Sequence, residues 1–549
     1  MPSTDVRARI KNLFPKIFEV PGTHDFAPGG GLYEKGDLYL LDGEVKRWAG
    51  ATAPVTSPVC VSEKDGPAAP RLIGRAATLT AEEAARAMQA AVRAYDRGRG
   101  KWPQMKVAER IHCVEHFAEL MEGTREEVVR LLMWEIGKTR KDSEKEFDRT
   151  VEYIRDTIEA LKDVDRQAGR FSMHSGILAQ IRRSPLGVTL CMGPYNYPLN
   201  ETFTTLVPAL IMGNTVICKL PRFGVLCSAP LLRCFASAFP AGVVNIVNGD
   251  GATVVTPAIA SEHLAALAFI GSAKVANILK RQHPMPNRLR CILGLNAKNP
   301  GIVLPDADVG LAVEHCVTGA LSYNGQRCTA LKLLFVHRSR AEEFVAALAE
   351  AVDKLPFGLP WEEGVKITPL PEPNKSEYLA ELLADAKKGG AKVCNKYGGL
   401  SNLTFFYPAV AYPVTPKMRM YHEEQFGPVI PVAVYDDVNE VLDYVTLAPF
   451  GQQASVFGND PKTIGSVVDV LANEVSRVNI NAQCQRGPDV YPFTGRKDSA
   501  EGTLSVSDAL RCFSIRSMIA APNSEANTEL MQEILLRRTS NFINTDYIF

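Results

Sequence analysis

The chain has 549 residues, of which 46% are hydrophobic and 22% are charged, a balance that excludes disordered, collagen-like and coiled-coil proteins. Its 61 Lys and Arg residues are matched by 61 Asp and Glu residues, so the net charge gives no electrostatic reason to expect nucleic acid or an anionic membrane as a partner. A chain of this length favours two to four domains.

The sequence also predicts a cytoplasmic protein. The longest uncharged stretches, residues 185–200 and 202–218, are interrupted by Pro, Gly and Asn and are shorter than the ~20 apolar residues that a membrane span needs. The first thirty residues mix acidic and basic side chains and lack the apolar core of a signal peptide. The 12 cysteines contain no C-x-x-C pair, so we expect thiols that are mostly buried.

The N-terminal part of the chain predicts an arm followed by helices. Residues 1–79 are rich in Pro, Gly and Asp, which suits a segment that lies over a domain. Thr80 and Glu83 have the spacing of a capping box at a helix start, and apolar residues at helical spacing continue to about residue 162.

From residue 185 onward, apolar β runs alternate with amphipathic segments, which predicts parallel βαβ units in a doubly wound sheet. The first series has strands at 186–192, 215–220, 243–247 and 264–270, with helices near 202–212, 228–238 and 274–282. A second series has strands at 301–304, 331–336, 429–435 and 478–480, with helices near 308–320, 340–354 and 375–388. We expect two α/β domains that join near residues 294–300, and an apolar tail beyond about residue 513 that docks on a neighbouring subunit.

Two motifs have simple structural interpretations. His112, Glu115 and His116 match the H-x-x-E-H pattern of zinc peptidases, but no third ligand with its own helical context follows, so we interpret them as a helix face and predict no metal site. Gly249 and Gly251 could begin a dinucleotide-binding G-x-G-x-x-G motif, but residue 254 is valine. Taken alone, this segment predicts a turn.

Residues 324–329, Asn-Gly-Gln-Arg-Cys-Thr, place a cysteine in a polar turn between a helix and a β run. A thiol in such a turn can be exposed, and we expect the neighbouring Arg327 to favour its thiolate, which is the nucleophilic form. Cys328 is therefore a candidate nucleophile.

Four further motifs accompany this turn. They are Met-Gly-Pro-Tyr-Asn-Tyr-Pro at 192–198, Gly-Asn-Thr-Val-Ile-Cys-Lys at 213–219, Phe-Ile-Gly-Ser at 269–272 and Glu-Glu-Gln-Phe-Gly-Pro at 423–428. In order and distance the five motifs resemble the aldehyde dehydrogenase superfamily, over about residues 80–520. The resemblance implies an aldehyde dehydrogenase-like α/β fold with two doubly wound domains and a small β element for oligomerisation.

The same resemblance implies domain limits and an assembly. The N-terminal arm and the cofactor-binding domain would comprise residues 1–168 and 187–297, and the catalytic domain residues 298–510. The oligomerisation element and the C-terminal tail would comprise residues 169–186 and 511–549. Members of the superfamily are usually dimers or tetramers, so we expect a homodimer or a homotetramer.

Within the superfamily, the chain most resembles the non-phosphorylating, NADP-dependent glyceraldehyde-3-phosphate dehydrogenases, through residues 484–489 and 491–495 and through Tyr197 and Arg327. The resemblance implies that Cys328 attacks the aldehyde and later carries a thioester. The Asn196 side chain and the Cys328 backbone N–H would hold the oxyanion, at ~3 kcal/mol for each aimed donor.

The resemblance also implies which residues bind the ligands. Residues expected to bind NADP are Tyr195, Lys219, Arg222, Gly251, Gly271, Ser272, Leu295, Glu424 and Phe426. Arg222 stands where many NAD-using relatives have glutamate, and an arginine favours the 2′-phosphate of NADP. Residues expected to bind the phosphate of glyceraldehyde 3-phosphate are Arg149, Tyr197, Arg327 and Arg486.

One residue of the family pattern is missing. The superfamily usually has Glu-Leu-Gly-Gly-Lys, whose Glu activates the water that hydrolyses the thioester, whereas residues 294–298 here are Gly-Leu-Asn-Ala-Lys. A placed general base contributes about 10²- to 10⁴-fold to a rate. If Gly294 has a positive φ, a glutamate at this position would be strained.

Three explanations are open for the missing glutamate. Another carboxylate, such as Glu424 or Glu501, acts as the base; or coenzyme A accepts the acyl group, as in semialdehyde dehydrogenases that lack the glutamate; or the chain is a catalytically weak scaffold that still binds its ligands. In the first two cases Cys328 is acylated.

Overall fold

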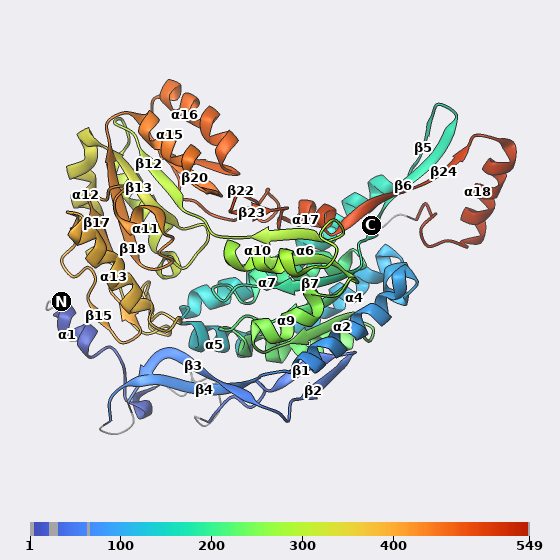
Figure 1. Ribbon diagram of the computed structural model, residues 1–549, viewed down its shortest axis with the longest axis horizontal. Helices are drawn as coiled ribbons and strands as arrows, with labels where there is room; N and C mark the ends of the chain where they lie inside the picture. The colour runs from blue at the N-terminus through green and yellow to red at the C-terminus, as the bar shows by residue number, and fades with distance from the viewer. Residues whose placement is uncertain (1–4, 21–30, 63–65, 547–549) are drawn as a thin grey trace.

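The computed structural model describes residues 5–20, 31–62 and 66–546, and two large β-sheets with helices packed on them dominate it (Figure 1). In the described residues the first sheet has the strand order β2-β1-β9-β8-β7-β10-β11-β23. Its strands are β2 (Glu44–Arg47), β1 (Leu38–Leu41), β9 (Val244–Val247), β8 (Thr215–Lys219), β7 (Val188–Met192), β10 (Leu264–Ile270), β11 (Arg290–Gly294) and β23 (Ala500–Glu501). The five strands from β9 to β11 are parallel, and antiparallel pairings occur at both edges.

The second sheet has the order β14-β17-β18-β13-β12-β20-β21 within the described part of the chain. Its strands are β14 (Lys392–Val393), β17 (Ala409–Tyr412), β18 (Val429–Tyr435), β13 (Leu331–His337), β12 (Asn299–Val303), β20 (Gln453–Phe457) and β21 (Arg477–Ile480). All neighbours are parallel except β14 and β17. Short two-stranded pairs are formed by β15 (Ser401–Asn402) with β16 (Phe405–Phe406) and by β19 (Phe450–Gly451) with β22 (Arg496–Lys497).

After a run of five successive α-helices in the N-terminal half, helices and strands mostly alternate along the chain. Those of the first half are α1 (Val6–Lys11), α2 (Ala81–Tyr95), α3 (Lys101–Gln104), α4 (Val107–Glu122), α5 (Arg125–Ile136), α6 (Arg140–Ala168), α7 (Asn200–Ile211), α8 (Leu232–Ala238), α9 (Gly251–Ile259) and α10 (Ala273–Gln282). Those of the second half are α11 (Val309–Leu321), α12 (Arg338–Asp353), α13 (Lys375–Lys388), α14 (Arg419–His422), α15 (Val438–Leu447), α16 (Pro461–Glu474), α17 (Val506–Cys512) and α18 (Glu525–Arg537). No helix in the described ranges has an apolar stretch long enough to cross a membrane.

Both faces of the first sheet are buried, which explains its continuous apolar strands. Leu190 and Ile217 belong to the core cluster that includes residues of α2 and α9, whereas Cys191 and Val216 belong to the cluster that includes α5, α6 and α7. The predicted α/β fold with two doubly wound units is confirmed, since each sheet has parallel central strands and crossover helices.

The strands and helices predicted from apolar runs are present with small changes at their ends. The structure adds α9, which starts where we interpreted Gly249 and Gly251 as a turn: Asp250 caps it by accepting a hydrogen bond from the Thr253 N–H at 3.0 Å. It also adds β17, β20, α15 and α16. The expected helix start is confirmed, because Thr80 accepts a hydrogen bond from the Glu83 N–H and α2 begins at the next residue.

The N-terminal arm forms defined structure. Its hairpin of β3 (Thr52–Val61) and β4 (Ala69–Ala77) runs along one side of the molecule, below α5 and the first sheet in Figure 1. The predicted limit at 297/298 falls between β11 and β12, but β23, from the predicted catalytic part, pairs with β11. The domain limits themselves stay a prediction.

A three-stranded sheet of β5 (Phe171–His174), β6 (Ile177–Pro185) and β24 (Ser514–Pro522) projects from the body of the molecule, with α18 near its far end (Figure 1). It joins the two segments predicted as the oligomerisation element. Part of the following tail contacts its own chain, since Arg182 donates to the Phe542 carbonyl at 3.1 Å and Lys106 pairs with Asp546 at 2.9 Å. Docking of the tail on another subunit stays a prediction, and its residues 547–549 lie outside the described residues.

The remaining motifs have ordinary structural roles. His112 and His116 are exposed on α4, and each faces a glutamate three residues further along. All 12 cysteines are free thiols, and most are buried, as predicted.

Candidate active site

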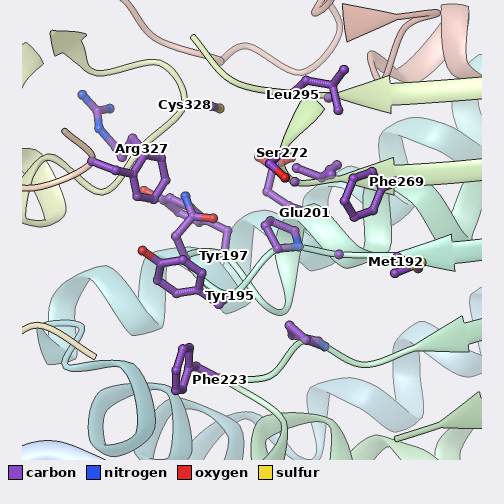
Figure 2. A pocket seen from close by; sticks show the side chains of 18 of the residues that line it. Met192, Tyr195, Tyr197, Glu201, Phe223, Phe269, Ser272, Leu295, Arg327 and Cys328 are labelled. Carbon is purple, nitrogen blue, oxygen red and sulfur yellow. The ribbon is translucent and has the colours of Figure 1, made fainter. Parts of the chain in front are cut away.

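Cys328 lies in the turn that joins α11 to β13, as the sequence predicts. Three successive residues of this turn, Tyr323, Asn324 and Gly325, have positive φ values of 49°, 56° and 71°. Such conformations are costly for residues that have a side chain. Hydrogen bonds to other segments stabilise these conformations. Tyr323 Oη donates to a carbonyl of α5 at 3.0 Å, and Asn324 exchanges two hydrogen bonds of 2.9 Å with Thr368. The fixed turn presents Cys328 in the wall of a cavity of about 500 Å³ (Figure 2).

Charges around the Cys328 thiol act in opposite directions. Burial raises the pKa of the thiol above its ordinary value, and the negative charge of Glu201 raises this pKa further, while Lys332 and Arg486 lower it. Arg327 is not among the main causes of this shift, and its guanidinium donates to a carbonyl of α11 at 3.0 Å. The cations that mainly lower this pKa are Lys332 and Arg486, so a contribution of Arg327 to the thiolate stays a prediction.

Asn196 is buried next to this turn. Its Nδ2 donates to the Gln326 carbonyl at 2.8 Å, which leaves the second N–H of the amide for the predicted oxyanion. The Asn196 carbonyl accepts a hydrogen bond of 2.9 Å from Lys138, whose buried ammonium pairs with Glu146. Glu146 also accepts the backbone N–H groups of residues 199 and 200, at 3.1 and 3.2 Å. One buried ion pair thus fixes both Asn196 and the start of α7.

Residues predicted to bind the cofactor line the same cavity, with one exception. The lining residues are Tyr195, Lys219, Arg222, Gly271, Ser272, Leu295, Glu424 and Phe426. Gly251 is not among the lining residues, because it forms the first turn of α9.

Two cations of this part of the cavity fit a ligand with phosphate groups. Lys219 ends β8 and is only 9% exposed, and no carboxylate forms an ion pair with it in the described ranges; burial lowers its pKa. Arg222 lines the cavity and is exposed, again with no ion pair in the part of the chain that the structure describes. Ser272 caps α10, and a helix N-terminus offers free N–H groups to a phosphate.

The predicted phosphate ligands also line the cavity; they are Arg149, Tyr197, Arg327 and Arg486. Two of these arginines already have carboxylate partners. Arg149 makes two hydrogen bonds to Asp489, at 2.7 and 2.8 Å, and Arg486 bonds both Asp489 and Glu201. Arg327 differs, because its buried Nε has no hydrogen-bond acceptor among the described residues. Three arginines and two carboxylates leave this group with one net positive charge.

Gly294, at the position of the family's general base, ends β11 without a positive φ. A Cβ on this residue would meet side-chain atoms of Ile270 and Leu504 at 3.4 Å, which is ordinary contact. The condition under which a glutamate would be strained here is therefore not met.

Neither carboxylate that we expected as a replacement base fits that role. Glu424 is fully engaged, because its Oε1 pairs with Lys332 and its Oε2 accepts from Asn296 Nδ2 at 2.7 Å. Glu501 lies in β23, pairs with the exposed Lys280 at 2.6 Å and does not line the cavity.

Sequence reasoning missed Glu201, which does line the cavity and is 7% exposed. A signal for it was present. Glu201 is the single charged residue between Pro185 and Cys218, and it stands between the two longest uncharged stretches of the chain. Acidic side chains are almost never buried without a partner, so an isolated carboxylate in a buried segment indicates a special role.

Comparison with known proteins agrees with this geometry. The sequence pattern of the aldehyde dehydrogenase family matches residues 61–519. The chain belongs to the aldehyde dehydrogenase family. The family's members are NAD(P)-dependent aldehyde oxidoreductases, and this chain is one of them by sequence and fold.

Three relatives illustrate the similarity. The NADP-dependent glyceraldehyde-3-phosphate dehydrogenase of Streptococcus equinus is 34% identical over 410 residues, which are 74% of this chain and 84% of that protein. The crystal structure of NADP-dependent glyceraldehyde-3-phosphate dehydrogenase from Bacillus halodurans C-125 complexed with NADP has a TM-score of 0.80 at 30% identity, and covers 89% of this chain and 100% of that one. The alpha-ketoglutaric semialdehyde dehydrogenase of Bacillus subtilis (strain 168) is 29% identical over 504 residues, 88% of this chain and 98% of that protein.

Proposed function

We propose that this aldehyde dehydrogenase uses NADP to oxidise glyceraldehyde 3-phosphate to 3-phosphoglycerate, without inorganic phosphate. The observation that carries the proposal is one cavity whose wall contains the Cys328 thiol, the Asn196 amide, two cations without ion pairs on the cofactor side, and three arginines on the substrate side. The named activity of the Streptococcus equinus relative supports the same substrate.

In this proposal Cys328 attacks the aldehyde carbon as a thiolate. The Asn196 amide and the Cys328 backbone N–H then stabilise the negative charge on the former aldehyde oxygen, at ~3 kcal/mol for each donor. Lys332 and Arg486, which lower the pKa of the thiol, increase the thiolate fraction against the effects of burial and Glu201. Bound NADP supplies the acceptor for the hydride, and the acyl group then remains on Cys328 as a thioester that must be hydrolysed.

Lys219 and Arg222 are the residues that would hold NADP rather than NAD. Their positive charges are not offset by ion pairs in the described ranges, so a 2′-phosphate could pair with Arg222 without displacing a carboxylate. The NADP in the Bacillus halodurans structure supports this choice.

Arg327 provides the test of the substrate. Because its Nε is buried and unbonded within the described residues, this arginine has a donor available for an anionic substrate group. Replacing it by Arg327→Gln should lower kcat/KM for glyceraldehyde 3-phosphate by about 10- to 100-fold, the loss of one charge-assisted hydrogen bond. Unphosphorylated glyceraldehyde is the internal control, and equal losses on both aldehydes would contradict a phosphate-binding role.

A second candidate substrate is a semialdehyde with a carboxylate tail. The single net positive charge of the arginine group suits one negative charge better than the two of a phosphate, because Arg149 and Arg486 are already paired. The name of the Bacillus subtilis relative points to the same class. A higher kcat/KM for alpha-ketoglutaric semialdehyde than for glyceraldehyde 3-phosphate would favour this candidate. Faster NADPH formation with coenzyme A present would show that the acyl group goes to a thiol instead of water.

A further inference from the structure

We propose that Glu201 is the general base that activates water for hydrolysis of the Cys328 thioester, in place of the glutamate missing at Gly294. The inference rests on the proposed function for the identity of the aldehyde, but it concerns a step that any acyl group on Cys328 must pass. Figure 2 shows both side chains in the wall of the same cavity.

Among the described residues, three glutamates line the cavity, and they differ in their partners: Glu201, Glu372 and Glu424. Glu424 has both oxygens engaged by Lys332 and Asn296. Glu372 uses its Oε2 to accept from Tyr195 Oη at 2.6 Å and to pair with Lys375 at 3.0 Å. Of the three, only Glu201 bonds an arginine of the predicted substrate group, Arg486, whereas Glu372 bonds Tyr195 on the cofactor side; Glu201 is also the one that acts on the charge of the Cys328 thiol.

Within the described part of the chain, the hydrogen bonds of Glu201 leave one carboxylate oxygen free, which a base needs. It lies in the first turn of α7, five residues after Asn196, on the helix that starts directly behind the oxyanion site. Its Oε2 accepts a hydrogen bond from Arg486, and in the described residues its Oε1 has no hydrogen bond. Arg486 is itself fixed by Asp489 at 3.0 Å and by the Leu504 carbonyl at 3.2 Å. One carboxylate oxygen is therefore anchored, and the other is available to a water molecule.

Hydrolysis of the thioester consumes one water molecule. The Glu201 carboxylate takes a proton from water, and the oxygen of that water attacks the thioester carbonyl carbon. The Asn196 amide holds the oxyanion of the resulting tetrahedral intermediate, which collapses with cleavage of the C–S bond. Cys328 leaves as a thiolate, the product leaves as a carboxylic acid, and the proton on Glu201 passes to solvent.

The first experiment uses p-nitrophenyl acetate, an activated ester that acylates a thiol and releases a coloured phenolate without NADP or an aldehyde. In Glu201→Gln the amide keeps the size and the acceptor oxygen for Arg486 but cannot take a proton. We expect a burst of one phenolate per active site, as in the wild type, followed by a steady rate lower by about 10²-fold or more. Glu501→Gln is the matched control, because that residue lies outside the cavity, and it should behave as the wild type.

Once excess ester has been removed, mass spectrometry of the denatured protein should find Cys328 still acetylated in Glu201→Gln at times when the wild type has already released its acetyl group. Hydroxylamine, a nucleophile that needs no general base, should release this acetyl group and restore turnover. Gly294→Glu in the same background should raise the steady rate as well, since a Cβ at this position would meet only ordinary contacts.

Two results would overturn the proposal. One is a wild-type steady rate in Glu201→Gln. The other is an equal loss of burst and steady rate that hydroxylamine does not relieve, because the defect would then lie in acylation or folding. The ester assay also separates this inference from the proposed function: if the wild type hydrolyses the ester through Glu201 but reduces no NADP with either aldehyde, only the substrate assignment fails.

Discussion

At the scale of single residues, the reactivity of Cys328 depends on charged residues outside its own turn. Glu201 raises the pKa of the thiol, while Lys332 and Arg486 lower it. The arrangement has a cost, because a carboxylate placed to activate water also opposes formation of the attacking thiolate. The positive charge of Arg486, which bonds Glu201, offsets part of this opposition.

This balance predicts how alkylation of Cys328 depends on pH. Only the thiolate reacts with iodoacetamide, so the rate should rise with pH, with a midpoint above that of an ordinary cysteine because the pKa is raised. Glu201→Gln removes a negative charge, so the pKa should fall and the profile should move to lower pH. At pH 7.5 the variant should therefore react faster than the wild type.

The measurement is the alkylation rate of Cys328, followed by peptide mass spectrometry from pH 6 to 10. Glu501→Gln should leave the profile in place. A shift of the Glu201→Gln profile to higher pH would mean that Glu201 stabilises the thiolate, contrary to the charge balance described above.

Residue identities were more predictable than residue pairings. The motifs identified residues that line one cavity, among them Cys328 and Asn196, with Gly251 as the exception. They did not reveal that Arg486 pairs with Glu201, 285 positions away, or that Arg149 pairs with Asp489, 340 positions away. Such pairs form only when two distant segments come into contact in the fold, and a single sequence does not indicate which segments do so.

At the scale of elements, apolar runs identified the buried central strands because both faces of these sheets are covered. Helix α9 was missed, because Asp250 and Gly251 are as typical of a turn as of the capped start of a helix. The connection between β7 and α7 shows what local patterns cannot predict. Its geometry depends on a buried ion pair between Lys138, which follows α5, and Glu146 on α6.

This ion pair predicts a large loss of stability when one partner is removed. Lys138→Met keeps much of the volume but leaves the Glu146 carboxylate buried without its cation, which typically costs about 3–5 kcal/mol. We expect a lower urea midpoint of unfolding and a lower kcat, because Lys138 also holds the Asn196 carbonyl.

The matched control is Arg166→Met, which removes the exposed partner of Asp163 at the end of the same helix. Exposed pairs contribute about 0–1 kcal/mol, so its urea midpoint should stay close to that of the wild type. Equal midpoints for the two variants would show that the buried pair does not stabilise the fold.

At the scale of the whole molecule, the projecting sheet of β5, β6 and β24 is the feature that a single chain does not explain (Figure 1). It carries exposed apolar side chains; these are Met173, Ile177, Ile515 and Met518, at 52%, 41%, 52% and 60% exposure. Exposed apolar groups gathered on one projecting element are typical of interaction sites. From the family resemblance we expect these side chains to contact a second copy of this chain.

We therefore predict that Met518→Glu weakens a homo-oligomer. Burial of a methionine side chain contributes about 1.5–3 kcal/mol, and in a two-fold symmetric interface each substitution counts twice. The dissociation constant should rise on the order of 100-fold or more, which light scattering coupled to gel filtration would detect as a lower mass at micromolar concentration.

Leu447→Glu is the control, since Leu447 is 84% exposed at the end of α15, away from this sheet, and its variant should keep the wild-type mass. A wild-type protein that is monomeric at every concentration, or a Met518→Glu variant with unchanged mass, would contradict assembly through the projecting sheet. Cys328 and Glu201 lie in the body of the molecule and not on this sheet, so a dissociated Met518→Glu variant should still show the ester burst.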